Sequence, residues 1–264
     1  MIVCRSRAEV DKLRTVNRLV GEVLAELKSL AAPGVTTSDL DRVAEQRVRQ
    51  AGAVPAFKGY HGFPATICSS VNEQVVHGIP SDRALREGDV ISIDLGAKLD
   101  GFFGDSAVTV PVGPVGEAVE SLLRATEEAL FRAINVMRPN ARVSDIGAAV
   151  QAHVEAQGFS VVREFVGHGI GTELHEEPQI ANYGPAGRGP RLAEGMVMAI
   201  EPMVNAGKAA VKVLADGWTA VTRDGSLSAH FEHTVVVTGD GCEILSLVDR
   251  DRSRTEELLV TLRR

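Results

Sequence analysis

A ten-residue pattern occurs twice in the chain, and both copies finish on a carboxylate. LREGDVISID at 85–94 recurs as LAEGMVMAIE at 192–201. Each copy carries the apolar residues of a β-strand and then reaches Asp94 or Glu201. An ionised carboxylate at the end of an apolar strand must find a partner or take up a proton. The repeat therefore predicts two related half-structures and marks both carboxylates as candidates for chemistry.

The similarity between the halves extends to a second pair of carboxylates. GDSAVTV at 104–110 aligns with FEHTVVV at 231–237, which places Asp105 opposite Glu232. The alignment needs an insertion in the second half, between the repeated strand and residue 231. With two copies and so long a period, the pattern favours related half-domains over a solenoid of many small repeats.

Apolar residues at helical spacing predict a pair of helices in each half. In the first half, such stripes cover residues 10–27 and 40–51, and TTSD just before the second stripe is a typical helix start. In the second half, the corresponding stripes cover residues 119–134 and 146–154. Each half therefore begins with two helices and continues into strands.

Short β-branched segments bounded by Gly, Pro or Asp predict the strands. They are VISIDLG at 90–96, SAVTVPV at 106–112, MVMAIEP at 196–202 and HTVVVTG at 233–239. Two helix pairs covering one mostly antiparallel sheet would bury a single core, so we expect an α+β fold. Because no Pro- or Ser-rich linker separates the halves, we expect one domain over 1–264, with halves at 1–112 and 113–264.

Composition restricts the class of protein. A chain of 264 residues with 44% hydrophobic residues can bury a substantial core. Its three cysteines lack paired spacing, and neither a signal peptide nor a membrane-spanning apolar run is present, which predicts a cytoplasmic protein. The net charge is -7 and the basic residues are dispersed, so we expect neither nucleic acid nor membrane as a partner.

Four carboxylates in matched strand positions predict a metal centre. If these side chains converge, their charges cannot stay ionised together without compensation, and two divalent cations balance four negative charges. Oxygen ligands with an imidazole suit Mn, Fe(II), Co or Zn, and the absence of cysteine from the set disfavours a thiolate zinc site. His168 and His175 in GHGIGTELHEEP are the candidate imidazoles. A single carboxylate at a strand end is more often a cap or a surface charge, so it is the repetition that favours a site.

The other histidines have structural explanations. His153 lies in an expected amphipathic helix, and we expect it to be solvated. Strand alternation turns His233 to the opposite face from Glu232, which favours a structural role. His61 aligns with His168 but shares only the following glycine with it, which favours structural support.

The motifs that contain these residues resemble type I methionine aminopeptidases, metal-dependent peptidases of the pita-bread fold. The resemblance covers nearly the whole chain and is carried by GYHGFPATICSSVNEQVVHGIP, DLGAKLDGFFGDSAVTV, GHGIGTELHEEP, AIEPM and DGWTAVTRDGSLSAHFEHTVVVT. It implies a pseudo-two-fold α+β architecture in which two helix pairs cover a curved, mostly antiparallel sheet. It also implies five metal ligands: Asp94 on one ion, His168 and Glu201 on the other, and Asp105 and Glu232 bridging both.

The resemblance further implies hydrolytic removal of the initiator methionine from nascent proteins, with preference for a small second residue. Two divalent ions, Co, Mn, Fe(II) or Zn, would bind to the five ligands, and metal-bound hydroxide would attack the scissile carbonyl. Glu201 is then the candidate for receiving the proton of the water. His175 would donate a hydrogen bond to the developing oxyanion, and His77 would contact the peptide beyond the scissile bond.

An apolar pocket for an unbranched thioether side chain is also implied. The corresponding positions are Tyr60, Phe63, Cys68, Leu174 and Trp218. Without the resemblance, core packing would be the preferred explanation for the aromatic residues. Phe63 stands where a Tyr is frequent in the family, and Leu174 where an aromatic residue is frequent, so we expect a pocket of altered shape that still accepts methionine.

Two other functions remain open from the sequence. A proline-directed aminopeptidase or dipeptidase has the same fold, although YHGFPATICSSVN is more similar to the methionine group. A non-catalytic binding relative would lack several ligands, whereas this chain has all five. For the favoured function, the resemblance implies nascent polypeptide N-termini as partners, the ribosome as a candidate place of encounter, and a monomer.

Overall fold

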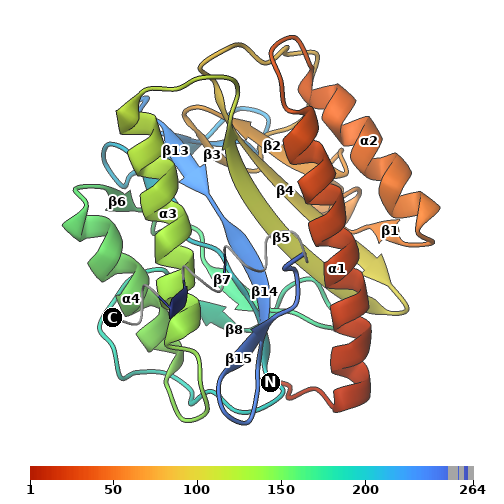
Figure 1. Cartoon of the computed structure of the whole chain (residues 1–264), viewed down its shortest axis with the longest axis vertical. Coiled ribbons are helices and arrows are strands. Elements are labelled where there is room, and N and C mark those ends of the chain that lie inside the picture. Colours follow the sequence, from red (N-terminus) through yellow and green to blue (C-terminus); the bar gives the residue numbers. More distant parts are fainter. Residues whose placement is uncertain (249–254, 256–258, 261–264) are drawn as a thin grey trace.

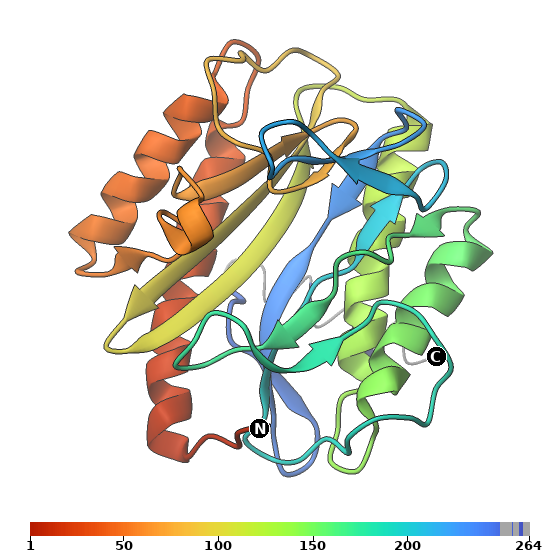
Figure 2. The same cartoon turned by 180° about the vertical axis from the view of Figure 1, so that it is seen from behind.

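A β-sheet with helices packed against one face forms the centre of the computed structural model, which describes residues 1–248, 255, 259 and 260 (Figure 1). The helices are α1 (Arg7–Leu30), α2 (Thr37–Gln50), α3 (Glu117–Asn135) and α4 (Val143–Ala156), with a short 3₁₀ turn, η1 (Tyr60–Gly62). The helix pair predicted in each half is thereby confirmed. Figure 2 shows the molecule from behind, with the sheet in front of the helices.

Side-chain caps explain where the first two helices begin. The Ser6 hydroxyl accepts from the backbone N–H of Glu9, and the Glu9 carboxylate accepts from the backbone N–H of Ser6. Thr36 and Asp39 form the same reciprocal pair at the start of α2. Each pair satisfies two backbone donors that the first helical turn leaves without partners. The start signal predicted at TTSD is confirmed.

The central sheet joins strands from both halves of the chain. Within the described residues the strands are β1 (Val54–Pro55), β2 (Ile67–Val71), β3 (Gln74–Val76), β4 (Val90–Leu99), β5 (Phe102–Pro111), β6 (Ser160–Val161), β7 (Gly167–Gly169), β8 (Glu176–Ile180), β9 (Val197–Ile200), β10 (Met203–Asn205), β11 (Val211–Val213), β12 (Ala220–Thr222), β13 (Ser228–His230), β14 (Glu232–Val237) and β15 (Cys242–Ile244). Nine of these described strands form one sheet in the order β1-β4-β5-β14-β9-β7-β8, with β2 beside β4 and β15 beside β14. The pairings within it are antiparallel, as predicted.

Strand β4 corrects one expectation drawn from the repeat. The repeat pattern finishes at Asp94 and the predicted strand at residue 96, but β4 continues to Leu99, because β5 pairs with it along its whole length, from Val90 opposite Pro111 to Leu99 opposite Phe102. Asp94 therefore lies in the middle of a strand. The second copy behaves as expected, since β9 ends at residue 200 and the carboxylate follows directly. The pairing partner, rather than the apolar pattern of the segment itself, sets where each strand ends.

The insertion predicted in the second half contains β10 to β13. These strands contribute to two small sheets, β13-β10-β6 and β11-β12-β3. Buried apolar side chains among the described residues form three clusters, not the single core that we expected. One cluster lies mainly under α1 and α2, a second under α3 and α4, and a small third one among the inserted strands. Each helix pair covers its own part of the sheet, which divides the core.

The described helices also bear on membrane association. In that part of the chain, no helix is both long enough and apolar enough to cross a membrane.

Candidate metal centre and its cavity

The four carboxylates of the repeat reach one cavity. Asp94 and Asp105 come from the β4–β5 hairpin, Glu201 follows β9, and Glu232 begins β14. The cavity has a volume of about 280 Å³. It is lined by all twelve of the residues that the sequence predicts for the site: Tyr60, Phe63, Cys68, His77, Asp94, Asp105, His168, Leu174, His175, Glu201, Trp218 and Glu232.

Strand alternation turns the carboxylates away from the helices. Gly104 faces α1, where an added Cβ would lie 3.0 Å from a backbone nitrogen of that helix, so the next residue, Asp105, faces the cavity. On β14, Glu232 lines the cavity, whereas His233 faces the helices and its Nδ1 lies 2.8 Å from the hydroxyl of Ser246. The opposite facing and structural role predicted for His233 are confirmed.

His168 supplies a nitrogen beside the carboxylates. Its Nε2 lies 3.5 Å from Glu201 Oε1 and 4.0 Å from Asp105 Oδ2. Its Nδ1 donates to the carbonyl oxygen of Gly169 at 2.9 Å, so the lone pair of the neutral ring is on Nε2. One ligand atom each from Asp105, His168 and Glu232 lie within 4.8 Å of one another. The ligand atoms around one bound metal ion have similar separations.

The glycines on either side of His168 allow close packing of strands. A Cβ on Gly167 would lie 2.5 Å from the carbonyl oxygen of Ala199, and one on Gly169 would lie 2.3 Å from that of Glu177. Side chains at either position would push β7 away from its neighbours. The two glycines therefore allow the close approach of β7 to the neighbouring backbone.

The buried carboxylates destabilise one another's charged forms. Among the described residues, Asp94 Oδ1, Asp105 Oδ1 and Glu232 Oε1 are buried without a hydrogen-bond partner. Burial raises the pKa of Asp94 to about 7, and burial together with neighbouring carboxylates raises the pKa values of Asp105, Glu201 and Glu232. Divalent cations favour an oxygen-rich set with one imidazole and would neutralise these charges. The residues present therefore fit a metal centre.

His175 lies on the exposed side of the cavity. Its Nδ1 is 2.8 Å from the hydroxyl oxygen of Tyr60, and its ring centroid is 4.4 Å from that of His168. Burial, and then the nearby His61, lowers the pKa of His175 below its usual value. The ring is therefore neutral at pH 7 and carries one N–H that it can donate.

His77 is held among aromatic rings on the other side. Its ring centroid lies 5.3 Å from that of Phe165 and 6.4 Å from that of Trp218. Its φ of 60° is in the left-handed region, which is uncommon for a residue other than glycine and is characteristic of functional sites. Burial, and then His175, lowers the pKa of His77 to about 4. The packing thus holds a neutral imidazole in a fixed orientation.

An apolar wall completes the cavity. Phe63, Cys68 and Leu174 are buried, and Tyr60 and Trp218 are half-buried. The rings of Phe63 and Trp218 meet edge to face with centroids 5.2 Å apart. Burial, followed by the charge of Asp94, raises the pKa of the Cys68 thiol well above its usual value. Cys68 thus contributes a buried thiol to this wall.

Comparison with known proteins identifies the family of a chain with this site. The sequence model of Metallopeptidase family M24 matches residues 11–239. The chain belongs to metallopeptidase family M24. Methionine aminopeptidase 1 of Bacillus subtilis (strain 168) is 52% identical over 248 residues, which make up 94% of this M24 chain and 100% of that protein.

Solved structures share the architecture of this M24 chain. A methionine aminopeptidase from Thermotoga maritima superposes with a TM-score of 0.93 at 44% identity, covering 94% of this chain and 100% of that one. An X-Pro aminopeptidase from Thermotoga maritima superposes with a TM-score of 0.74 at 23% identity, covering 94% of this chain and 63% of that one. The second likeness shows the fold alone. The predicted pita-bread fold is confirmed.

Three residues at or near the cavity were not among the predicted site residues. Phe57 and His61 line it. The ring of His61 is exposed and packs edge-on against that of Tyr60 with centroids 4.4 Å apart, and structural support stays the prediction for this residue. His230 is buried, and its Nε2 lies 3.8 Å from Glu201 Oε2. Its position two residues before Glu232 is the sequence signal that could have located it.

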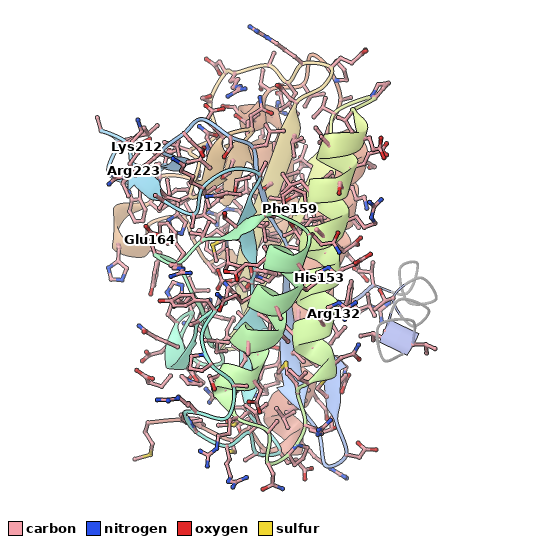
Figure 3. The ribbon with its side chains drawn as sticks, turned by 90° about the vertical axis from the view of Figure 1, so that its left-hand side faces the viewer. Arg132, His153, Phe159, Glu164, Lys212 and Arg223 are labelled. Atoms are coloured by element: carbon pink, nitrogen blue, oxygen red, sulfur yellow. The ribbon has the colours of Figure 1, made fainter. Side chains whose placement is uncertain are left out.

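His153 corrects another expectation. We predicted a solvated histidine, but the side chain is buried between α4 and α3, with Nε2 3.1 Å from Glu128 Oε2. Figure 3 shows His153 on α4 and Arg132 on the adjacent α3. Burial, and then Arg132, lowers the pKa of His153. The packing of a second helix, which the periodicity of α4 does not reveal, buries the ring.

The loop that carries Leu174 and His175 is fastened to the start of the chain. The Arg5 side chain is 5% exposed and pairs with the carboxylate of Glu176. That carboxylate also accepts from the backbone N–H groups of Thr172 at 2.8 Å and Glu173 at 3.1 Å. A buried ion pair thus fixes the turn just before His175. This role was not predictable from local sequence patterns, because Arg5 and Glu176 are far apart in the chain.

Proposed function

We propose that this chain is a methionine aminopeptidase, an enzyme that hydrolyses the bond after an N-terminal methionine. The observation that carries the proposal is that the ligands, histidines and apolar residues expected for this function line one cavity. The 52% identity to the Bacillus subtilis enzyme over nearly the full length of both chains supports the same function.

The five ligand candidates would hold two divalent ions. We assign Asp94 to one ion, His168 and Glu201 to the other, and Asp105 and Glu232 to both, and we propose Co, Mn, Fe(II) or Zn as the metals. When bound, such ions polarise a carbonyl group and lower the pKa of a bound water to near neutrality. The unpartnered oxygens of Asp94, Asp105 and Glu232 support this assignment, because each has a lone pair available.

The protein residues would position the peptide and move protons. The Glu201 carboxylate would accept the proton of the attacking water and return it to the leaving amine. The N–H of the neutral His175 would stabilise the negative charge that develops on the scissile carbonyl oxygen. His77, held by the rings of Phe165 and Trp218, would contact the peptide beyond the scissile bond.

The apolar wall would select the methionine side chain. Phe63, Cys68 and Leu174 offer a buried surface on which a linear thioether can replace water, and contacts of sulfur with aromatic rings add to this. Leu174 is shorter than an aromatic residue and leaves more room near His175. We propose that the pocket accepts methionine and that the second residue of the substrate must be small.

We further propose that residues 1–264 work as one catalytic domain built from halves at 1–112 and 113–264. Both halves contribute carboxylates to the same cavity, which supports this organisation. Nascent polypeptide N-termini, met at or near the ribosome, are the proposed substrates. A monomeric state and a cytoplasmic location remain predictions from the sequence.

Peptide hydrolysis in defined metals tests the proposal. Metal-free protein should cleave Met-Ala-Ser only after Mn²⁺, Co²⁺, Fe²⁺ or Zn²⁺ is added, and should cleave it faster than Ala-Pro or other Xaa-Pro peptides. Met-Leu-Ser serves as the control for a large second residue and should be cleaved slowly. Faster cleavage of the proline peptides would favour the proline-directed alternative. Absence of activity with every one of these metals would favour a non-catalytic relative.

A further inference from the structure

His230 is a buried histidine beside Glu201 that belongs to no ligand or substrate set assigned above. It is 2% exposed, and its Nε2 has no hydrogen-bond partner in the part of the chain that the structure describes. A buried polar nitrogen left without a partner costs about 1–3 kcal/mol. A side chain kept at this cost in a well-packed region calls for a functional explanation.

The carboxylate of Glu201 lies close to this nitrogen. His230 Nε2 lies 3.8 Å from Glu201 Oε2, while His168 Nε2 lies 3.5 Å from the other oxygen, Oε1. Two imidazoles therefore bracket one carboxylate, with one ring beside each oxygen. The Glu201 backbone is fixed as well, because its carbonyl oxygen accepts from Asn182 Nδ2 at 2.9 Å.

The backbone of His230 is held firmly. Its N–H donates to the Thr109 hydroxyl at 2.8 Å, and its carbonyl oxygen accepts from the same hydroxyl at 2.6 Å. That hydroxyl also lies 2.8 Å from the hydroxyl of Ser92. His230 is in addition paired with Met203 across β10 and β13. The ring is therefore carried by a backbone that cannot drift away from Glu201.

We propose that His230 is a positioning residue that donates its Nε2–H to Oε2 of Glu201 and so keeps Oε1 directed at the ion shared with His168. At 3.8 Å the two atoms are beyond hydrogen-bond distance, and the proposal requires a rotation of the carboxyl group about its last torsion angle, which has a broad energy profile. This role deepens the proposed function and rests on it. Partners of metal-binding side chains typically change metal affinity or activity by about 10–100-fold when they are removed.

A matched pair of substitutions tests the role of the N–H group. His230→Leu introduces an apolar side chain of similar size and removes the N–H donor, whereas His230→Gln replaces the imidazole with an amide that can still donate. Metal-free proteins are titrated with Mn²⁺ under anaerobic conditions by calorimetry, and hydrolysis of Met-Ala-Ser is measured at saturating metal. His153→Gln serves as the control, because that histidine lies between α3 and α4, away from the cavity.

For His230→Leu, the expected result is a loss of about 10–100-fold in Mn²⁺ affinity, together with a lower kcat and little change in KM. His230→Gln should recover both the affinity and kcat. Equal affinities in wild type and His230→Leu would overturn the positioning role. Failure of His230→Gln to recover would also overturn it, in favour of direct ligation by the imidazole. If His230→Leu does not fold, His230→Ala replaces it with the same expectation. If the wild type itself binds no Mn²⁺, the proposed function fails, and the two failures are thereby distinguished.

Discussion

The two halves of the chain bring their carboxylates to the cavity by different routes. In the first half, Asp94 and Asp105 lie on one hairpin whose strands pair residue by residue, with Gly96 opposite Asp105. In the second half, Glu201 lies just after the end of β9, and β10 to β13 separate it from Glu232 in the sequence. The first pair is therefore fixed by the backbone ladder of a sheet. The second pair depends more on side-chain support.

The difference suggests where the specific features of the enzyme reside. In the hairpin, the pairing of β4 with β5 fixes the positions of the two carboxylates relative to each other. The inserted segment adds Trp218 to the cavity wall and places His230 beside Glu201. A duplicated plan thus supplies the charges, and the insertion in one copy shapes their surroundings. Substitutions in the two halves should accordingly have different effects.

The largest effect is expected in the first half, at the proposed bridging carboxylate. Asp105→Asn should lower kcat/KM for Met-Ala-Ser by more than ~100-fold. Removing a group that hydrogen-bonds to a metal ligand typically costs about 10–100-fold in metal affinity or activity, and removing the ligand itself should cost more. The metal-free variant should be no less stable than the wild type, since a buried carboxylate without compensation is replaced by a neutral group of the same shape. Metal content and urea unfolding are measured together. Near-normal turnover would contradict the assignment of Asp105.

The second largest effect concerns the support of the second-half loop. Arg5→Met should lower the free energy of unfolding by up to about 3–5 kcal/mol, because it leaves the largely buried Glu176 carboxylate, which is 13% exposed, without its cationic partner. The loop that carries His175 should loosen, and kcat should fall as well. Arg14→Met is the control, since the 42% exposed Arg14 side chain pairs with Glu243 at the surface and should contribute only about 0–1 kcal/mol. Similar losses in the two variants, measured by urea unfolding, would show that the Arg5 pair is not special.

A moderate effect is expected for the insertion. Trp218→Ala should raise KM for Met-Ala-Ser by about 3–12-fold, because a half-buried aromatic ring contributes roughly half of the 1.5–3 kcal/mol of a fully buried apolar side chain. Mn²⁺ affinity should stay unchanged, because the ring of Trp218 packs against Phe63 and His77, neither of which is a proposed metal ligand. Steady-state kinetics and calorimetry check this. A loss of metal binding without a change in KM would mean that the inserted strands support the charges as well.

The smallest effect is a pH dependence away from the cavity, in the helix pair of the second half. Burial lowers the pKa of His153, so below about pH 6.5 the unfolded chain takes up more protons at this residue than the folded protein does. Stability of the wild type should therefore fall as pH decreases through this range. His153→Gln should fall less steeply when urea unfolding is measured between pH 7 and pH 5. Parallel curves would mean that the ring is not desolvated.

Much of the site was predictable because strand pairing follows from a repeat. Two copies of one pattern placed four carboxylates in equivalent positions, and equivalent positions on one sheet share a face. The helix pairs were predictable for a similar reason, since their periodicity is local. The lengths of the strands were not, because β4 continues past Asp94 only where β5 offers it a partner.

The unpredicted features all depend on contacts between distant segments. His153 is buried by the packing of α3, Arg5 finds Glu176 on another loop, and His230 approaches Glu201 because β13 returns beside β10. None of these contacts has a periodic signal in the sequence. His61 shows the reverse case, because alignment with His168 was a true sign of proximity to the cavity that local context argued against.

The alternation of Glu232 and His233 on β14 has a consequence for folding. Strand β14 lies between β5 and β9, and a slip of one residue would exchange the two faces of the strand. The Glu232 carboxylate would then enter the apolar layer near Phe131, and an imidazole would replace it among the carboxylates. Such a misaligned sheet would bury a charge among apolar side chains and would also remove one proposed metal ligand from the site. The residues that would hold the metal thus also act as a check on correct strand alignment during folding.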